Sequence, residues 1–155
     1  MNDKDYANKP IIVCLCGSTR YMEAFAAAGW ELTLMGQIVL TIGVCKHADS
    51  HGGEALGPDV AQRLDALHLR KIDIADWVLI LNVGGYVGES TAGERNYARD
   101  TGKPLAYLTT GQMSKSPPLL DKVEDRNAVA RLTREAFGLV EQGVLARRAR
   151  GKIAT

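Results

Sequence analysis

The sequence predicts an α/β fold, a doubly wound parallel sheet with helices on both faces. Short apolar runs alternate along the chain with segments of helical periodicity. This is the order expected of parallel strands joined by helical crossovers. The runs show no alternation of polar and apolar residues, so we expect strands that are buried on both faces. Glycines mark the turns between these elements.

The first part of the chain supplies two strands and the helix that joins them. Residues 10–16 form an apolar run and predict the first strand. The helix that follows carries its apolar residues at helical spacing and ends at a glycine. Residues 37–42 predict the second strand. A polar loop then covers 43–57, and its histidines, His47 and His51, could line a pocket.

A second helix precedes the third strand. Proline is favoured in the first helical turn, so this helix is predicted to begin at Pro58, and it ends near Ala75. We expect its buried side to be formed by Val60, Leu64, Leu67 and Ile72 or Lys71. Apolar residues at this spacing predict a helix that packs against the sheet.

The stretch over 76–108 organises the rest of the chain. Residues 77–83 form an apolar run that is too short for a helix, so we expect a buried third strand. A glycine-rich turn and a helix follow, and the helix runs to about Asp100 and stops at Gly102. Residues 105–108 predict the fourth strand. Ligands of such sheets bind beyond the carboxyl ends of the strands, so the turn after the third strand is the expected site.

The glycine-rich turn is predicted to bring backbone N–H groups close to a ligand. Gly84, Gly85 and Gly88 would supply unusual backbone angles and allow close approach. Ser90 and Thr91 are preferred N-cap residues, so the next helix is predicted to begin there. The N–H groups at a helix N-terminus favour an anionic ligand.

The functional prediction depends on Glu94, which we place in the first turn of this helix. One interpretation is structural, because Thr91-x-x-Glu94 fits the capping box. The other is catalytic. The positive end of the helix dipole would favour the charged carboxylate, which could attack an anomeric carbon or stabilise the cation formed as a glycosidic bond breaks. The residues alone leave both open.

A second candidate site follows the first strand, at the same edge of the sheet. The run Gly17-Ser18-Thr19-Arg20 offers backbone N–H groups, two hydroxyls and a guanidinium, which together suit a phosphate. The alternative is an ordinary capped turn with a surface arginine. Neither the P-loop pattern nor G-x-G-x-x-G occurs, which argues against a P-loop and against a dinucleotide site.

The composition sets limits on the class of protein. The 19 basic and 18 acidic residues give a net charge of +1, so nothing marks the chain as a nucleic-acid or membrane protein. No apolar run approaches the ~20 residues of a membrane span. After Tyr107 and Leu108, helices are predicted over 119–142, and the basic tail over 143–155 is interpreted as a solvated or frayed terminus, with phosphate or nucleic-acid contact as the alternative.

The chain of 155 residues is predicted to form a single domain, with a core over 10–108 and a helical extension over 117–148. Its N-terminus is charged and shows no signal peptide, so with its few cysteines we expect a cytoplasmic location. Cys14 and Cys16 share one face of a strand and are predicted to be buried as small hydrophobes. A zinc site that joins them to Cys45 and His47 would fit no standard spacing, and we expect neither a metal nor a cofactor.

Residues 10–108 resemble the nucleoside 2-deoxyribosyltransferase-like superfamily, which includes the 2′-deoxynucleoside 5′-phosphate N-hydrolases. The matching features, in order, are Gly17-Ser18-Thr19-Arg20, Ala75-Asp76 at a strand start, the Gly/Ser/Thr-rich turn, Glu94-x-x-x-Ala98 and Gly102-Lys103-Pro104. Their order and spacing carry the resemblance, which covers about two thirds of the chain. It implies a flavodoxin-like (Rossmann-like) fold.

The resemblance implies cleavage of the N-glycosidic bond of a nucleoside 5′-monophosphate or a nucleoside, by hydrolysis or by deoxyribosyl transfer. The role of nucleophile falls on Glu94. The residues expected to bind substrate are Gly17, Ser18, Thr19, Arg20, Gly85, Tyr86, Gly88, Ser90 and Thr91. The resemblance also implies a homodimer or higher homo-oligomer with a small-molecule nucleotide or nucleoside as its partner. The composition predicts no membrane partner and argues against a nucleic acid.

One position departs from the family. An aspartate is expected eight residues before the strand-start aspartate, here Asp76, and the chain has His68 there. His68 could act as a general acid toward the leaving base, since its ordinary pKa is near neutrality, or it could be a packed helix residue. Asp65 and Asp73 flank it and could supply the missing carboxylate. The departure leaves a non-catalytic nucleotide-binding or sensing module as the alternative function.

Three aromatic residues are candidates for stacking on a base. Tyr86, in the glycine-rich turn, is the best placed for a ligand contact, and Tyr21 is a further candidate. Trp77 lies inside a strand and is predicted to belong to the core. Glu89 is the only counterpart of an acidic residue that the transferases carry before the nucleophile, and it is offset by one position.

Overall fold

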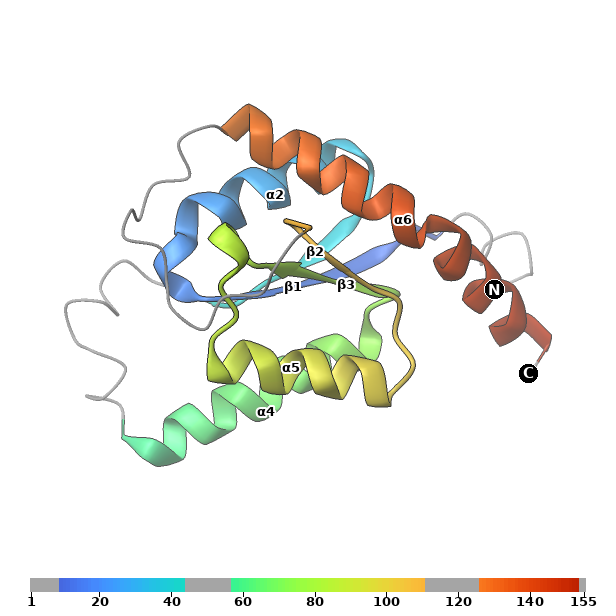
Figure 1. The fold of residues 1–155 in the computed structure, drawn as a ribbon. Coiled ribbons are helices and arrows are strands. Elements are labelled where there is room, and N and C mark those ends of the chain that lie inside the picture. The colour runs from blue at the N-terminus through green and yellow to red at the C-terminus, as the bar shows by residue number, and fades with distance from the viewer. Residues whose placement is uncertain (1–8, 44–56, 111–125, 154–155) are drawn as a thin grey trace.

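The structure, a computed structural model, describes residues 9–43, 57–110 and 126–153. Four strands in these ranges form one sheet in the order β2-β1-β3-β4, and every neighbouring pair is parallel (Figure 1). The strands are β1 (Ile12–Gly17), β2 (Ile38–Leu40), β3 (Trp77–Leu81) and β4 (Leu105–Tyr107). The predicted parallel sheet is therefore confirmed, with strand ends that differ from the prediction by no more than two residues.

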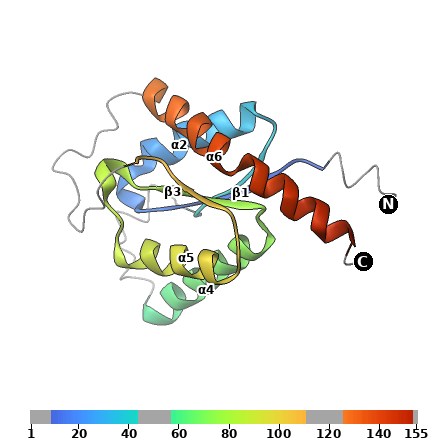
Figure 2. The same ribbon diagram turned by 45° about the vertical axis from the view of Figure 1, so that its right-hand side comes forward.

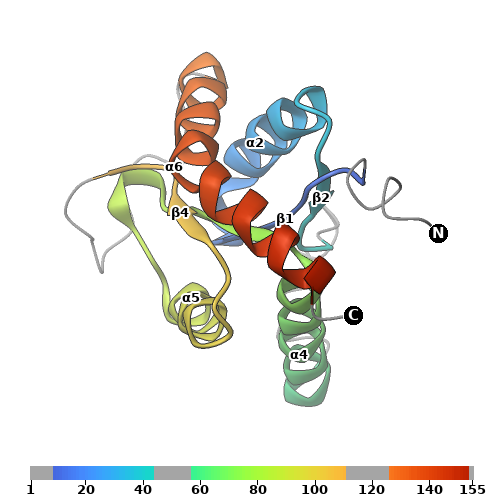
Figure 3. The same cartoon turned by 90° about the vertical axis from the view of Figure 1, so that its right-hand side faces the viewer.

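Helices cover both faces of the sheet. The helices α2 and α6 lie on one face, and α4 and α5 lie on the other (Figures 1 and 3). Their bounds are α2 (Met22–Leu34), α4 (Pro58–Ile74), α5 (Glu89–Asp100) and α6 (Arg126–Ile153), with short 3-10 turns η1 (Thr19–Tyr21) and η3 (Val83–Gly85). This is the doubly wound, flavodoxin-like arrangement that the sequence predicts. Of the described helices, none combines the length and apolar character that crossing a membrane requires.

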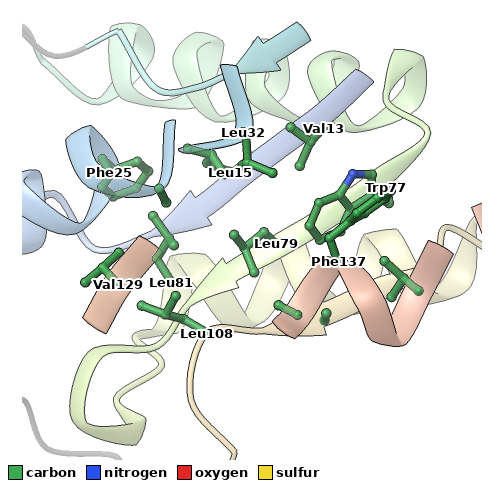
Figure 4. Packing of buried hydrophobic residues seen from close by; sticks show 14 of the residues in the cluster. Val13, Leu15, Phe25, Leu32, Trp77, Leu79, Leu81, Leu108, Val129 and Phe137 are labelled. Carbon is green, nitrogen blue, oxygen red and sulfur yellow. The ribbon is translucent and has the colours of Figure 1, made fainter. Parts of the chain in front are cut away.

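The larger core lies between the sheet and the pair α2/α6. Val13 and Leu15 of β1 and Trp77 and Leu79 of β3 point to this face and are fully buried, as Figure 4 shows. The ring of Trp77 lies 5.4 Å from that of Phe137 on α6, measured between ring centroids. Trp77 is thus a core residue, as expected, and the residues between these positions along each strand face the opposite layer.

The helix α4 corrects one prediction about burial. Leu64 and Leu67 are 54% and 52% exposed, whereas His68 and Ile72 are buried. Of the predicted buried side, Ile72 is confirmed, Val60 and Lys71 are partly buried, and the predictions for Leu64 and Leu67 are wrong. The preceding loop, with His47 and His51, lies outside the described residues.

The basic tail is not a frayed terminus. It continues α6 as one helix to Ile153, and it crosses the amino ends of the strands (Figure 2). Arg148 donates hydrogen bonds to the carbonyl oxygens of Lys9 and Pro10, both at 2.6 Å, and to Oδ2 of Asp76 at 2.8 Å. The same carboxylate oxygen accepts the N–H of Ile12 at 2.8 Å. Charge and hydrogen bonding therefore dock the helix onto the amino edge of the sheet.

Arg147 makes a second attachment at this edge. Its guanidinium donates to the carbonyl oxygens of Gly102 and Thr101, which end α5. Cations near a helix C-terminus satisfy carbonyl groups that have no partner within the helix. The prediction failed here because the partners lie far away in the sequence and leave no local pattern in the tail.

Candidate active site

The carboxyl ends of β1 and β3 form the topological switch point of the sheet. The chain leaves β1 toward α2 on one face and leaves β3 toward α5 on the other face (Figure 1). The two connections therefore separate, and ligands of open α/β sheets bind in the crevice between them. The two predicted binding turns both begin at this edge.

The turn after β1 has the geometry of a capped turn. Oγ of Ser18 accepts the N–H of Arg20 at 3.3 Å, and the carbonyl of Ser18 accepts the N–H of Tyr21 at 3.1 Å. The side chains of Thr19 and Arg20 are exposed. The hydroxyl of Ser18 is thus used within the turn, while Thr19 and Arg20 face solvent at the switch point.

Gly17 is explained by strand packing. A Cβ atom at this position would lie 3.1 Å from Cβ and 3.2 Å from the carbonyl oxygen of Leu81, which is its partner on β3. Contacts this short would force the two strands apart. The close approach that the glycine permits is therefore to the neighbouring strand, and not in the first place to a ligand.

The glycine-rich turn after β3 uses its glycines in two ways. Gly84 and Gly85 have φ angles of 62° and 80°, in the left-handed region that favours glycine. Gly88 has a φ of −73°, so the prediction of an unusual angle there is wrong. It is small for another reason: a Cβ atom at Gly88 would lie 3.0 Å from the hydroxyl of Tyr86.

Tyr86 and Tyr21 meet edge to face at this edge of the sheet. Their ring centroids lie 6.3 Å apart with an angle of 73° between the planes. Tyr21 is almost fully buried and belongs to the core, so it cannot stack on a base. Tyr86 is half-buried and remains the aromatic side chain that could contact a ligand.

The helix α5 begins one to two residues earlier than predicted. Gly88 is its N-cap, no side chain caps it, and Ser90 and Thr91 lie inside its first turn. The first helical hydrogen bond runs from the N–H of Ala92 to the carbonyl of Gly88 at 2.8 Å. The N–H groups of Glu89, Ser90 and Thr91 precede that bond and have no acceptor within the helix. Ser90 and Glu89 are exposed, and Thr91 is buried.

Glu94 therefore lies in the second turn of α5 and not in the first. Thr91 is inside the helix, so Thr91 and Glu94 do not form a capping box. The helix dipole acts mainly on the first turn, which weakens the predicted effect on this carboxylate. Its side chain is 13% exposed, and burial raises the pKa of Glu94 while His68 opposes the rise only in part. The predicted preference for the charged form is wrong in direction.

Four functional side chains meet on the α4/α5 face of the sheet. Nε2 of His68 lies 3.8 Å from Oε2 of Glu94, 3.3 Å from Sγ of Cys16 and 3.7 Å from Sγ of Cys14. The two cysteines come from β1, His68 from α4 and Glu94 from α5. Cys14 and Cys16 are two residues apart on a strand, so both thiols point to the same face and under the same imidazole.

The cluster shifts the acidity of its members. Burial alone would lower the pKa of His68, but hydrogen bonding to Cys14 and the charges of Cys14 and Glu94 outweigh it, so this pKa is raised. Hydrogen bonding with the Cys16 thiol lowers the pKa of Cys14 to about 6 despite burial, and His68 acts in the same direction. The same pairing raises the pKa of Cys16. Nδ1 of His68 has no hydrogen-bond partner in the described part of the chain.

The two aspartates that flank His68 have different surroundings. Asp65 is exposed one turn earlier on α4, toward the switch point, and its charge contributes to the raised pKa of Glu94. Asp73 lies at the other end of α4, where it accepts the hydroxyl of Tyr97 at 2.6 Å and pairs with Arg70 at 3.0 Å. Of the two, only Asp65 is placed to act near Glu94.

The sequence brought forward His68 and Glu94 separately, and the structure brings them together. It also adds Cys14 and Cys16, which were predicted to be small hydrophobes and are buried but polar in their contacts. Their shared strand face was the available signal; the element above that face was not evident. Cys45, the third cysteine, lies outside the described residues. A comparison with protein-family models finds no match, and a search of curated proteins finds none either.

Proposed function

We propose that this protein cleaves the N-glycosidic bond of a nucleoside 5′-monophosphate or a nucleoside, with Glu94 as the nucleophile. One observation carries the proposal: a largely buried carboxylate at the switch point of the sheet lies 3.8 Å from an imidazole. Ligand sites of this fold type occur at that edge, and paired titratable groups with shifted pKa values are concentrated at functional sites.

The proposed reaction has two steps. A carboxylate oxygen of Glu94 forms a bond to C1′ of the sugar as the bond from C1′ to the base breaks, and the base leaves with that electron pair and takes up a proton. Water, or a second base in the transfer reaction, then displaces Glu94 from C1′. Partial burial makes the carboxylate less solvated and so a better nucleophile, provided that it is ionised.

His68 fits a positioning role better than the role of general acid. In a displacement the base departs from the face of the sugar opposite to the nucleophile, and His68 lies directly beside the nucleophile. A protonated imidazole there would hold the carboxylate in place and favour its charged form. Asp65, which is exposed nearer the switch point, is the better candidate to protonate the leaving base.

Two features support a 5′-phosphate on the substrate. The N-terminus of α5 has free N–H groups and no side-chain cap, which suits an anion. The turn after β1 presents Thr19 and Arg20 at the same edge of the sheet. A phosphate bound between the two turns would leave the sugar within reach of the side chain of Glu94.

The test is an incubation of the protein with ribo- and deoxyribonucleoside monophosphates, followed by chromatography for free base. We expect release by the wild type and by Asp100→Asn, a control with the same change from carboxylate to amide at an exposed residue at the opposite end of the same helix. Release should be lost in Glu94→Gln. If no substrate releases base while one or more of them binds, the alternative of a non-catalytic nucleotide-binding or sensing module replaces the proposal. That alternative is favoured by the buried histidine at the position where the family has an aspartate.

A further inference from the structure

We propose that Cys14, Cys16, His68 and Glu94 form a binding site for one soft or borderline divalent metal ion of the Zn²⁺ class. The atoms Sγ of Cys14, Sγ of Cys16 and Nε2 of His68 all lie within 4.8 Å of one another. Oε2 of Glu94 lies 3.8 Å from the same nitrogen. Two thiols, an imidazole and a carboxylate are a ligand set that proteins use for zinc.

The spacing of these atoms matches the edges of a zinc tetrahedron. Zinc bonds of about 2.3 Å to sulfur and about 2.0 Å to nitrogen place the two ligand atoms about 3.5 Å apart in tetrahedral geometry. The two distances from sulfur to Nε2 are 3.3 and 3.7 Å. Oε2 of Glu94 lies 3.8 Å from Nε2, against about 3.3 Å expected by the same reasoning. The carboxylate would therefore have to move toward the other three ligands to complete the tetrahedron.

The scaffold holds most of this arrangement in place before a metal arrives. Cys14 and Cys16 are fully buried in the central strand β1, and His68 is buried on α4. Glu94 is the most accessible member, with 13% of its side chain exposed. Thiolate and imidazole ligands select zinc, cobalt or cadmium over magnesium and calcium, which prefer oxygen. On binding, each thiol gives up its proton to solvent.

The site would be closed, because four protein ligands leave no open position for water or substrate. The metal would therefore not take part in the chemistry. If Glu94 is the nucleophile, as the proposed function requires, a bound metal would occupy the carboxylate and stop bond cleavage. This inhibitory effect rests on the proposed function, whereas the metal site itself does not.

The experiment uses the full chain, reduced and stripped of metal with a chelator, and titrates it with Co²⁺ alone. We expect one equivalent to bind with thiolate-to-cobalt charge-transfer absorption and the intense visible bands of a tetrahedral site, and Zn²⁺ to displace it. Cys16→Ser should lose about half of the charge-transfer absorption, because one of the two thiolates remains. Cys45→Ser is the control and should bind like the wild type, because it leaves all four proposed ligands unchanged.

A second variant distinguishes loss of a metal ligand from a folding defect caused by a substitution in β1. His68→Gln leaves β1 unchanged and should weaken Co²⁺ binding by ~10-fold or more, while circular dichroism shows an intact fold. Absence of the thiolate band in the wild type, or its persistence at full strength in Cys16→Ser, would overturn the inference.

The outcomes also separate the metal site from the enzymatic proposal. Glu94→Gln should retain a thiolate-to-cobalt band, since three ligands remain, yet release no base. A chain that releases base but gives no cobalt spectrum loses the metal site and keeps the proposed function. A chain that binds cobalt through its thiols but releases no base keeps the metal site and loses the proposed function.

Discussion

The two faces of the central sheet are built for different purposes by residues that alternate along the same strands. On the α2/α6 face, Val13, Leu15 and Leu79 pack into an apolar core with aromatic rings. On the α4/α5 face, Cys14 and Cys16 lie beneath an imidazole and a carboxylate. Neighbouring residues of β1 therefore face different layers. Substitutions on the α2/α6 face should mainly lower stability, and substitutions on the α4/α5 face should mainly lower activity.

The sharpest test of this division is Glu94→Gln, on the chemical face. Base release should fall by roughly 10³-fold or more, because an amide cannot serve as the nucleophile. The free energy of unfolding should change by less than ~1 kcal/mol, since the side chains are nearly equal in size. Activity assays and urea denaturation of the same preparation measure both. A large loss of stability would show that Glu94 belongs to the core in spite of its partners.

The complementary substitution is Leu79→Ala, on the packing face. Removal of a fully buried leucine leaves a cavity, so the free energy of unfolding should fall by about 2–5 kcal/mol. The activity of the fraction that remains folded should stay near that of the wild type. Urea denaturation and a folded-state assay at low temperature decide this. Equal stability of Leu79→Ala and the wild type would refute the assignment of the larger core.

A smaller effect is expected at the amino edge, which belongs to neither face. Arg148→Ala removes a partly buried partner of Asp76 and two bonds to backbone carbonyls, so we expect a loss of about 1–3 kcal/mol. Arg150→Ala is the control, because Arg150 lies two residues further along the same helix and is exposed. Its free energy of unfolding should stay within ~0.5 kcal/mol of that of the wild type. If both variants behave alike in thermal unfolding, the docking of α6 does not depend on Arg148.

The smallest effect concerns pH. Burial raises the folded-state pKa of Glu94 above its ordinary 4.5, so the unfolded chain ionises first as pH rises and gains stability relative to the folded chain. The pKa of His68 is raised above 6.5, so its contribution is present below that pH and is lost as pH rises through the folded value. Both act in the same direction.

Relative to Glu94→Gln, the wild type should therefore lose stability from about pH 4.5 to beyond pH 6.5. The difference between the wild type and Leu79→Ala serves as the reference, because that substitution changes no titratable group. Chemical denaturation at a series of pH values measures both differences. If the wild type instead becomes more stable relative to Glu94→Gln as pH rises over this range, the assigned direction of the pKa shifts is wrong.

What the sequence predicts well is what local patterns determine. The order of elements, the buried runs and the glycines that end α2 and α5 follow from residues within a few positions of one another. Glu94 and His68 were found because each stands at a recognisable place in the chain. The contact of His68 with the two thiols was not predicted, since it joins residues that are 52 and 54 positions apart.

The remaining errors have the same origin. The start of α5 was misjudged because Gly88, rather than a hydroxyl residue, occupies the N-cap. On α4 the leucines Leu64 and Leu67 are exposed while His68 is buried, and the hydrophobic pattern of the sequence favoured the leucines. Arg147 and Arg148 appeared as surplus charge because their acceptors are backbone groups of other elements.

The hydrogen bonds from Arg148 to the residues that precede β1 join positions up to 139 residues apart. During synthesis, β1 leaves the ribosome long before its partner has been translated, and domains generally fold as their parts emerge. Closure of so long a loop must follow the assembly of the sheet, since contacts between distant positions form slowly. A chain that ends before Arg148 would leave the carbonyl groups of Lys9 and Pro10 and the carboxylate of Asp76 without this partner, so the start of the first strand would be held less firmly than in the full chain.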